Sequence, residues 1–230
     1  MILLLVFVGV WDLFLFSRQD SWDKSLVFIL SFIPIIFLPF YALVGGFYTL
    51  HEEWRKKSIV QLLSLPVRCI TITGTKLLAV WLESVVFIVV TFIGAILFNK
   101  KANLDPIPIQ VLIQYGLLIL ITAILVSILS QFSYIIGRVF RRIRWLISIW
   151  VFLLTGWGIF RYYGYLNPFF SFVPNIQLNS WFLSGIWQYL GDTSTPQTIQ
   201  IHGPTTTVLL LSFILVFFLG SWVLKKYTEV

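Results

Sequence analysis

Six apolar stretches, separated by short polar connections, limit the folds open to this chain. A helix that crosses the hydrocarbon core of a bilayer, about 30 Å thick, needs roughly 20 residues at about 1.5 Å each. The stretches that approach this length are residues 2–16, 26–50, 72–98, 109–136, 146–163 and 208–224. With 59% hydrophobic and 11% charged residues, the chain has too few polar groups to cover a soluble core. We therefore expect an all-α, polytopic membrane bundle of six transmembrane helices, with residues 1–230 forming one domain.

The second stretch contains two prolines and a pair of glycines. Pro34 and Pro39 each lack a backbone N–H and are expected to kink the helix. Gly45 and Gly46 have no side chain, so a neighbouring helix backbone is expected to approach closely there.

Of the 16 Lys and Arg residues, eleven lie on one side of the predicted bundle and five on the other. Most of them lie in residues 51–76, in residues 137–145 and just after the sixth stretch. Cytoplasmic connections carry an excess of these residues, so we expect both termini to be cytoplasmic, in a bacterial cytoplasmic membrane. Because the net charge of +7 comes from such short clusters, it indicates topology and contact with membrane lipid rather than with nucleic acid.

Residues 51–68, which read HEEWRKKSIVQLLSLPVR, combine charge with a helical pattern. Apolar residues at positions 59, 62 and 63 are interleaved with polar residues at 58, 61 and 64. This spacing predicts an amphipathic helix along the inner membrane face, ended by Pro66. A basic connection that only fixes topology explains the lysines and arginines equally well. It does not explain Glu52 and Glu53, because topology asks only for positive charge.

This segment, followed by ITGTKLLA at residues 72–79, resembles the cytoplasmic signature of ABC-2 type permeases, the membrane subunits of type 2 ABC exporters. In that family an acidic residue opens an elbow after the second span, and Leu-Leu, Pro-Val-Arg and Gly-x-Lys-Leu follow. The matching positions are Glu53, Leu62, Leu63, Pro66, Val67, Arg68, Gly74, Lys76 and Leu77. The family usually has a cytoplasmic amphipathic helix before its first span, whereas this sequence is apolar from its first residues.

The resemblance implies a permease of an ATP-driven exporter that is not itself an enzyme. Separate ABC ATPase subunits would bind and hydrolyse ATP with Mg, and a second copy or a related permease would complete the pair. This chain would hold no cofactor and no metal. The residues implied to couple it to the ATPase are Glu52, Glu53, Arg55, Lys56, Lys57, Leu62, Leu63, Pro66, Arg68, Arg138, Arg141 and Arg142. Anchoring to anionic lipid explains the arginines at least as well.

Two further features suit a substrate pathway. Glu83 lies inside the third stretch, where an ionisable group is costly and often functional, and Asp12 lies in the first. A structural hydrogen bond explains either carboxylate as well. Residues 164–207 hold no Lys or Arg but many aromatic residues, spaced for one or two short helices in the outer interface. The candidates are Glu83, Phe169, Phe170, Trp181 and Trp187, and such a lining suits amphipathic, lipid-like or peptide cargo. An aromatic belt without a gating role is the alternative.

An intramembrane protease is the main rival function. Glu52 and Glu53 followed by Lys57 are similar to the EExxxR element of one such family, but lysine replaces the required arginine. HEEWR is not a zinc-binding HExxH motif, because Arg55 stands where the second histidine would be. The single Cys69 excludes a cysteine metal cluster. A membrane immunity or assembly protein that transports nothing is the third possibility.

Overall fold

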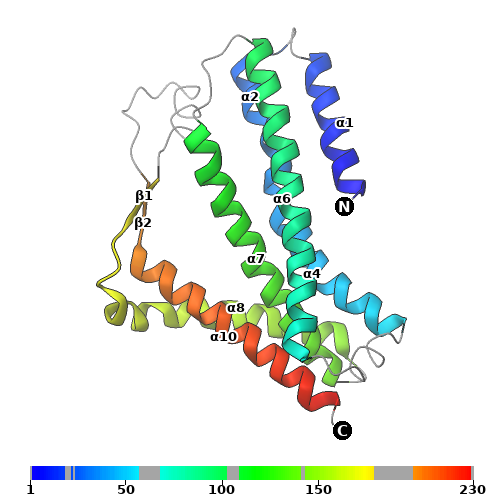
Figure 1. The fold of residues 1–230 in the computed structure, drawn as a ribbon, viewed down its shortest axis with the longest axis vertical. Coiled ribbons are helices and arrows are strands. Elements are labelled where there is room, and N and C mark those ends of the chain that lie inside the picture. The colour runs from blue at the N-terminus through cyan, green and yellow to red at the C-terminus, as the bar shows by residue number, and fades with distance from the viewer. Residues whose placement is uncertain are drawn as a thin grey trace. The chain divides into compact units, whose positions relative to one another are not determined.

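The computed structural model describes residues 2–18, 22, 24–56, 68–102, 109–140, 143–178 and 199–228, and these are almost entirely helical. Figure 1 shows the elements, several of which are long single helices. Their bounds are α1 (Ile2–Arg18), α2 (Lys24–Ser31), α3 (Ile33–Ile36), α4 (Leu38–Arg55), α6 (Cys69–Ala102), α7 (Ile109–Val139), α8 (Arg144–Leu166), η1 (Asn167–Phe170), β1 (Ile176–Leu178), β2 (Ile199–Ile201) and α10 (Gly203–Thr228).

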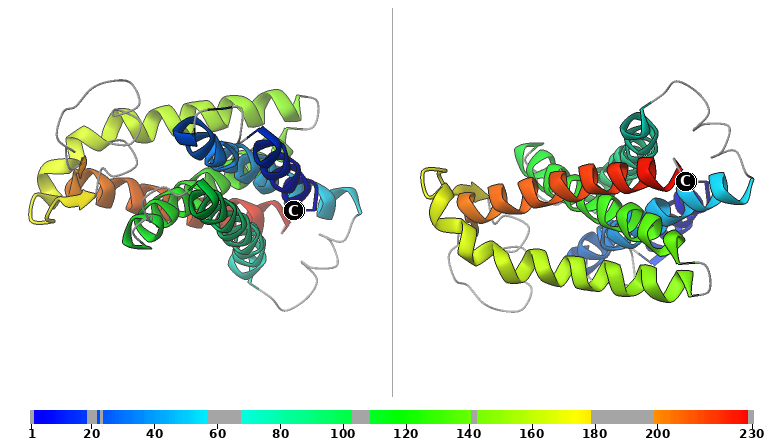
Figure 2. Two further views of the ribbon diagram at one scale, coloured as in Figure 1. Left: turned by 90° about the horizontal axis from the view of Figure 1, so that it is seen from above. Right: turned by 90° about the horizontal axis from the view of Figure 1, so that it is seen from below.

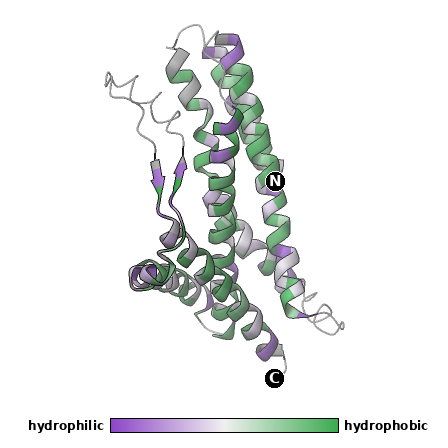
Figure 3. Ribbon diagram, turned by 60° about the vertical axis from the view of Figure 1, so that its left-hand side comes forward, coloured by the Kyte–Doolittle hydropathy of each residue, from purple (hydrophilic) through white to green (hydrophobic). Residues whose placement is uncertain are grey.

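Four of the six predicted spans are helices long and apolar enough to cross a membrane. They are α6, α7, α8 continued through η1, and α10, and most of their turns are hydrophobic in Figure 3. Each extends beyond its predicted bounds, because polar residues such as Lys100 and Lys225 continue the helix past the apolar run. The first predicted span is the 17-residue helix α1, and whether α1 and the second predicted span cross the membrane remains a prediction.

The second predicted span is divided into α2, α3 and α4 by turns at Phe32 and Phe37. Pro34 and Pro39 occupy the second positions of α3 and α4, as the expected kinks require. A proline in the first turn of a helix loses no intrahelical hydrogen bond, and it prevents the preceding helix from continuing through it. The predicted single span is therefore a kinked series of helices.

The chain packs as two compact units, and α6 and α7 each contribute to both. Unit 1 comprises Met1–Leu38, Leu82–Ile121 and Gln177–Gln200. Its core joins α1, α2 and α6 through the buried side chains of Leu15, Val27 and Phe98. Unit 2 comprises Pro39–Trp81, Thr122–Ile176 and Ile201–Val230.

Unit 2 is built around α7. Ile128 and Leu129 of α7 pack with Phe213 and Val216 of α10, and side chains of α8 close the same cluster. In Figure 2, α7 lies between α8 and α10, which meet near η1. A second cluster, of Leu50, Ile135 and Leu224, joins the ends of α4, α7 and α10.

The expected close approach occurs at Gly46, where α4 crosses α7. A Cβ atom at this position would lie 1.8 Å from Ser130 Oγ and 2.9 Å from the carbonyl oxygen of Ser127. Ser127 Oγ also donates a hydrogen bond across the same contact to the carbonyl of Ala42, at 3.2 Å. At Gly45, by contrast, a Cβ would meet only Val80, at an ordinary 3.5 Å. Small residues therefore set the separation of these two helices.

The segment before α10, where one or two short amphipathic helices are expected, is described at residues 164–178 and 199–202, so that prediction lies partly outside the described residues. Residues 167–170 form a 3₁₀ turn, and β1 and β2, which were not predicted, pair as a two-stranded sheet. Helix α10 begins at Gly203, five residues before the predicted start at 208. The backbone N–H of Gly203 donates to Asn175 Oδ1 at 3.1 Å, which satisfies one of the free donors at a helix start.

Candidate functional site

The end of α4 carries three of the predicted coupling residues, Glu52, Glu53 and Arg55, and a fourth, Lys56, directly follows it. They are held in place by the cluster of Leu50, Ile135 and Leu224, against which Trp54 and Tyr134 also pack. Of the other predicted coupling residues, Arg68 is exposed just before α6 and Arg138 lies in α7. Lys57, Leu62, Leu63, Pro66, Arg141 and Arg142 lie outside the described residues, as does the predicted amphipathic helix.

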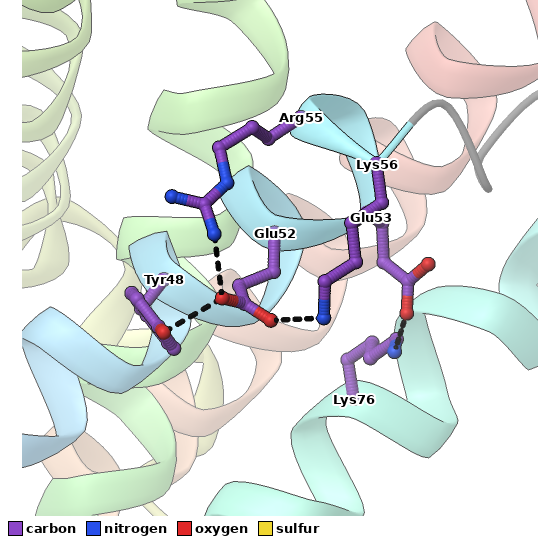
Figure 4. A network of polar contacts seen from close by, with 6 residues as sticks. All are labelled: Tyr48, Glu52, Glu53, Arg55, Lys56 and Lys76. Atoms are coloured by element: carbon purple, nitrogen blue, oxygen red, sulfur yellow. Dashed lines mark hydrogen bonds and ion pairs between the residues drawn. The ribbon is translucent and has the colours of Figure 1, made fainter.

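Glu52 accepts hydrogen bonds from residues one helical turn away on either side (Figure 4). Tyr48 Oη donates to Oε1 at 2.7 Å, and Lys56 Nζ donates to Oε2 at 2.8 Å. Arg55 lies slightly further off, with its Nη2 3.6 Å from Oε1. Side chains four residues apart face each other on a helix, so the sequence spacing alone accounts for these contacts. The side chains of Arg55 and Lys56 are 67% and 62% exposed, so both cations face outwards.

The contacts of Glu52 give the end of α4 a predictable response to pH. The hydrogen bonds from Lys56 and Tyr48 lower the pKa of Glu52 below its ordinary 4.5, and Glu52 raises the pKa of Lys56 above 10.5. The stabilisation by Glu52 is therefore complete above pH 4.5 and is lost as the pH falls through the lowered pKa. We expect the Lys56 amide, bonded to the Glu52 carbonyl, to lose hydrogen-exchange protection below pH 4.5 after correction for intrinsic rates. Glu52→Gln should abolish this acid-dependent loss, and an identical acid response in that variant would contradict the assignment.

Glu53 points away from this cluster and forms an ion pair with Lys76 of α6 (Figure 4). The two side chains are only 20% and 26% exposed, so water screens their attraction less than at an open surface. Both residues belong to the signature recognised in the sequence, where they stand 23 positions apart. The pair ties the end of α4 to the second turn of α6, on either side of residues 57–67.

Arg138 packs against the end of α4. Its Nε and Nη2 atoms donate to Tyr134 Oη, with the Nε distance 2.8 Å. Its guanidinium also lies over the ring of Trp54, 5.4 Å from the centroid. Tyr134 Oη in turn lies 3.3 Å from His51 Nδ1. Sequence reasoning missed Tyr134 and Trp54; the four-residue spacing of Tyr134 and Arg138 was the available signal.

The residues predicted for a substrate pathway are divided between the two units. Glu83 is half-buried in the part of α6 that belongs to unit 1. Phe169 and Phe170 lie in η1 of unit 2, and Phe169 is 75% exposed. Trp181 and Trp187 lie outside the described residues. Asp12 packs against Gly94 of α6, where a Cβ would lie 2.5 Å from Oδ2.

Unit 2 also contains a buried polar layer that the sequence did not reveal. Thr73 and Ser221 share a hydrogen bond of 2.8 Å between α6 and α10. Gln131 of α7 lies in the same region, 2% exposed, and its amide has no hydrogen-bond partner among the described residues. Serine and threonine hydroxyls readily form hydrogen bonds with each other or with the helix backbone, whereas a buried side-chain amide needs several hydrogen-bond partners.

No described group of His, Cys, Asp and Glu side chains has the three members needed to hold a metal ion. The carboxylates that a protease mechanism would use are both engaged by cations. Glu52 is held by Lys56 and Glu53 by Lys76. This arrangement suits a charged contact surface on a helix end better than a base that activates water.

The long apolar helices are those of an integral membrane protein, and the exposed cations Arg55 and Lys56 lie at the end of α4. The chain belongs to the ABC-2 family transporter proteins, whose family model matches residues 3–226. It is thus the membrane permease subunit of an ABC transporter, and membership implies association with ABC ATPase subunits. No curated protein and no solved structure matches the chain.

Proposed function

We propose that this permease works in an ATP-driven exporter and that a separate ATPase subunit acts on the end of α4 and the segment that follows it. One observation carries the proposal: the Glu53–Lys76 ion pair joins α4 to α6, while Arg55 and Lys56 next to it face outwards. A partner that binds the two exposed cations would therefore move both helices together. The surface of the ATPase subunit that binds these two cations would need acidic groups.

The remaining parts of the proposal are supported by the family and by the distribution of charged and aromatic residues. ATP and Mg bind to the ATPase subunits, and both termini lie in the cytoplasm of a bacterial cell, as the basic helix ends favour. A second copy or a related permease completes the transporter. The exposed apolar face of α8, with Trp150, Leu153 and Trp157, offers a surface for that permease or for lipid. Amphipathic, lipid-like or peptide cargo suits the aromatic residues around η1.

Charge reversal at Arg55 tests the coupling contact. The chain, co-expressed with an ABC ATPase encoded by a neighbouring gene and purified in mild detergent, is expected to retain that ATPase. Arg55→Glu should lower both the retained ATPase and the ATPase rate of the complex about tenfold, because like charges would then face each other across the interface. Arg161→Glu makes the same charge change at an exposed residue near the C-terminal end of α8. It should leave the retained ATPase and the ATPase rate unchanged.

Two results would contradict the proposal. One is a well-folded chain that never carries an ATPase in mild detergent. The other is an Arg55→Glu complex that is indistinguishable from the Arg161→Glu complex in both measurements.

A further inference from the structure

The hydroxyl of Tyr134 in α7 acts as a hydrogen-bond donor towards α4. Its oxygen accepts N–H groups from both Nε and Nη2 of Arg138, one turn later in α7. A hydroxyl has two lone pairs and one hydrogen, so with both lone pairs in use it can only donate. His51 Nδ1 of α4 lies 3.3 Å from the hydroxyl oxygen, and the two rings meet edge to face with their centroids 6.2 Å apart. The contact is therefore a hydrogen bond from Tyr134 to His51.

The direction of this hydrogen bond sets the protonation of His51. Nδ1 can accept only when it carries no proton, so the imidazole is neutral and its proton is on Nε2. A protonated ring would direct an N–H at an oxygen that already accepts two N–H groups. It would also add a positive charge next to the guanidinium of Arg138. The hydrogen bond between α7 and α4 therefore forms only with neutral His51.

The elements packed around His51 bring mainly cations to it. The titratable residues that line the cavity between α4, α7 and α8 together with His51 are Tyr48, Tyr134, Arg138 and Arg144. Further cations at this end of unit 2 are Arg55, Lys56, Arg68, Lys76, Lys225 and Lys226. Among the described residues, the carboxylates there are Glu52 and Glu53, each bound by a lysine. A proton on His51 would enter a region of positive charge, and the exposed ring can take up that proton directly from water.

We propose that His51 and Tyr134 form a pH-sensitive latch between α4 and α7, which is closed while His51 is neutral and opens when it is protonated. The Glu53–Lys76 pair, which joins α4 to α6, does not involve His51. Acidification would therefore release the end of α4 from α7 and leave its connection to α6 in place. The inference rests on the proposed function only for its consequence, namely that acid would weaken the effect on α7 of an ATPase that acts on α4.

Hydrogen exchange in the purified full chain tests the latch without any ATPase. The Lys56 amide donates to the carbonyl of Glu52 at the end of α4, so it reports the release of this helix end. Histidine gains its charge between about pH 8 and pH 5. Over this range the protection of the amide, corrected for intrinsic rates, should fall roughly fivefold, as expected for the loss of one hydrogen bond. The acid response of Glu52 lies below pH 4.5 and does not overlap.

Three variants separate the latch from a general effect of acid. His51→Asn keeps an acceptor near the position of Nδ1 but cannot take up a proton, so protection should stay high at both pH values. Tyr134→Phe removes the donor and keeps the ring, so protection should be low at both. His202→Asn makes the same change at the other of the two histidines, and its pH response should match that of the unaltered chain.

The protonation of His51 can also be observed directly. The His202→Asn chain holds a single histidine, so isotope labelling of histidine gives the nitrogen NMR signals of one ring. At about pH 8 they should show Nδ1 without a proton. The inference would be overturned by a proton on Nδ1 at that pH, or by protection of the Lys56 amide that does not fall on acidification of the unaltered chain. A fall of the same size in His51→Asn or in Tyr134→Phe would overturn it as well.

Discussion

Gly46→Ala is expected to lower the thermal stability of the detergent-solubilised chain, although alanine is normally the better helix residue. The new Cβ would lie 1.8 Å from Ser130 Oγ, which can rotate away, and 2.9 Å from the carbonyl of Ser127, which cannot. Helices α4 and α7 would have to separate, and overpacking of this kind costs about 1–3 kcal/mol. The measurement is the fraction of chain that stays monodisperse in size-exclusion chromatography after heating to a series of temperatures.

The neighbouring glycine supplies the control. A Cβ on Gly45 would meet only Val80 at 3.5 Å, so Gly45→Ala should leave stability unchanged or raise it by up to about 1 kcal/mol. Ser130→Ala removes the nearer obstacle, the Ser130 Oγ atom, and should restore part of the stability of Gly46→Ala, but not all of it, because the Ser127 carbonyl remains. If Gly45→Ala is as harmful as Gly46→Ala, the contact between α4 and α7 is not as close as described.

Reversing either charge of the Glu53–Lys76 pair is expected to reduce the ATPase rate of the assembled transporter about tenfold. Glu53→Lys would place two lysines against each other, and Lys76→Glu two glutamates, in a site where both side chains are mostly covered. The repulsion would release α4 from α6, and breaking a partly buried pair costs more than breaking an exposed one. The double variant, with the two charges exchanged, should recover most of the rate.

If exchanging the two charges restores the ATPase rate, the two residues act as a specific pair. Two harmful changes at unrelated sites would instead have effects that add. Lys76→Glu combined with Glu52→Lys keeps the same net charge and should not recover, because Glu52 faces Lys56 rather than α6. An exchanged variant no better than the two single variants would show that the pair does not transmit motion between α4 and α6.

The sequence was informative where one short-range rule decides the structure. Apolar length predicted α6, α7, α8 and α10, and proline chemistry predicted the kinks near Pro34 and Pro39. The four-residue spacing of Glu52 and Lys56 was enough to place their contact. The strands β1 and β2 were missed because each is only three residues long, although in both a glutamine stands between two aliphatic residues.

Contacts between distant parts of the chain were beyond sequence reasoning. The resemblance implies that Glu53 is a coupling residue, but nothing in its local pattern indicated that Lys76, rather than another cation, is its partner. At the early start of α10, the N–H of Gly203 donates to Asn175, which lies 28 residues earlier in the chain. The cavity between α4, α7 and α8 requires a helix crossing angle, which apolar patterns do not specify.

The contact at Gly46 also limits how α4 moves. Sliding this helix along α7 by one turn would bring Ala42 or Leu50 to the position of Gly46, and neither side chain fits against the Ser127 carbonyl. Tilting about Gly46 leaves the glycine in place and changes only the positions of the helix turns before and after it. We therefore expect a force on the Arg55 end of α4 to tilt the helix about Gly46, so that the end near Pro39 moves in the opposite direction. A partner that acts on one end of α4 would therefore rotate the helix about Gly46 and would not shift it along its own axis.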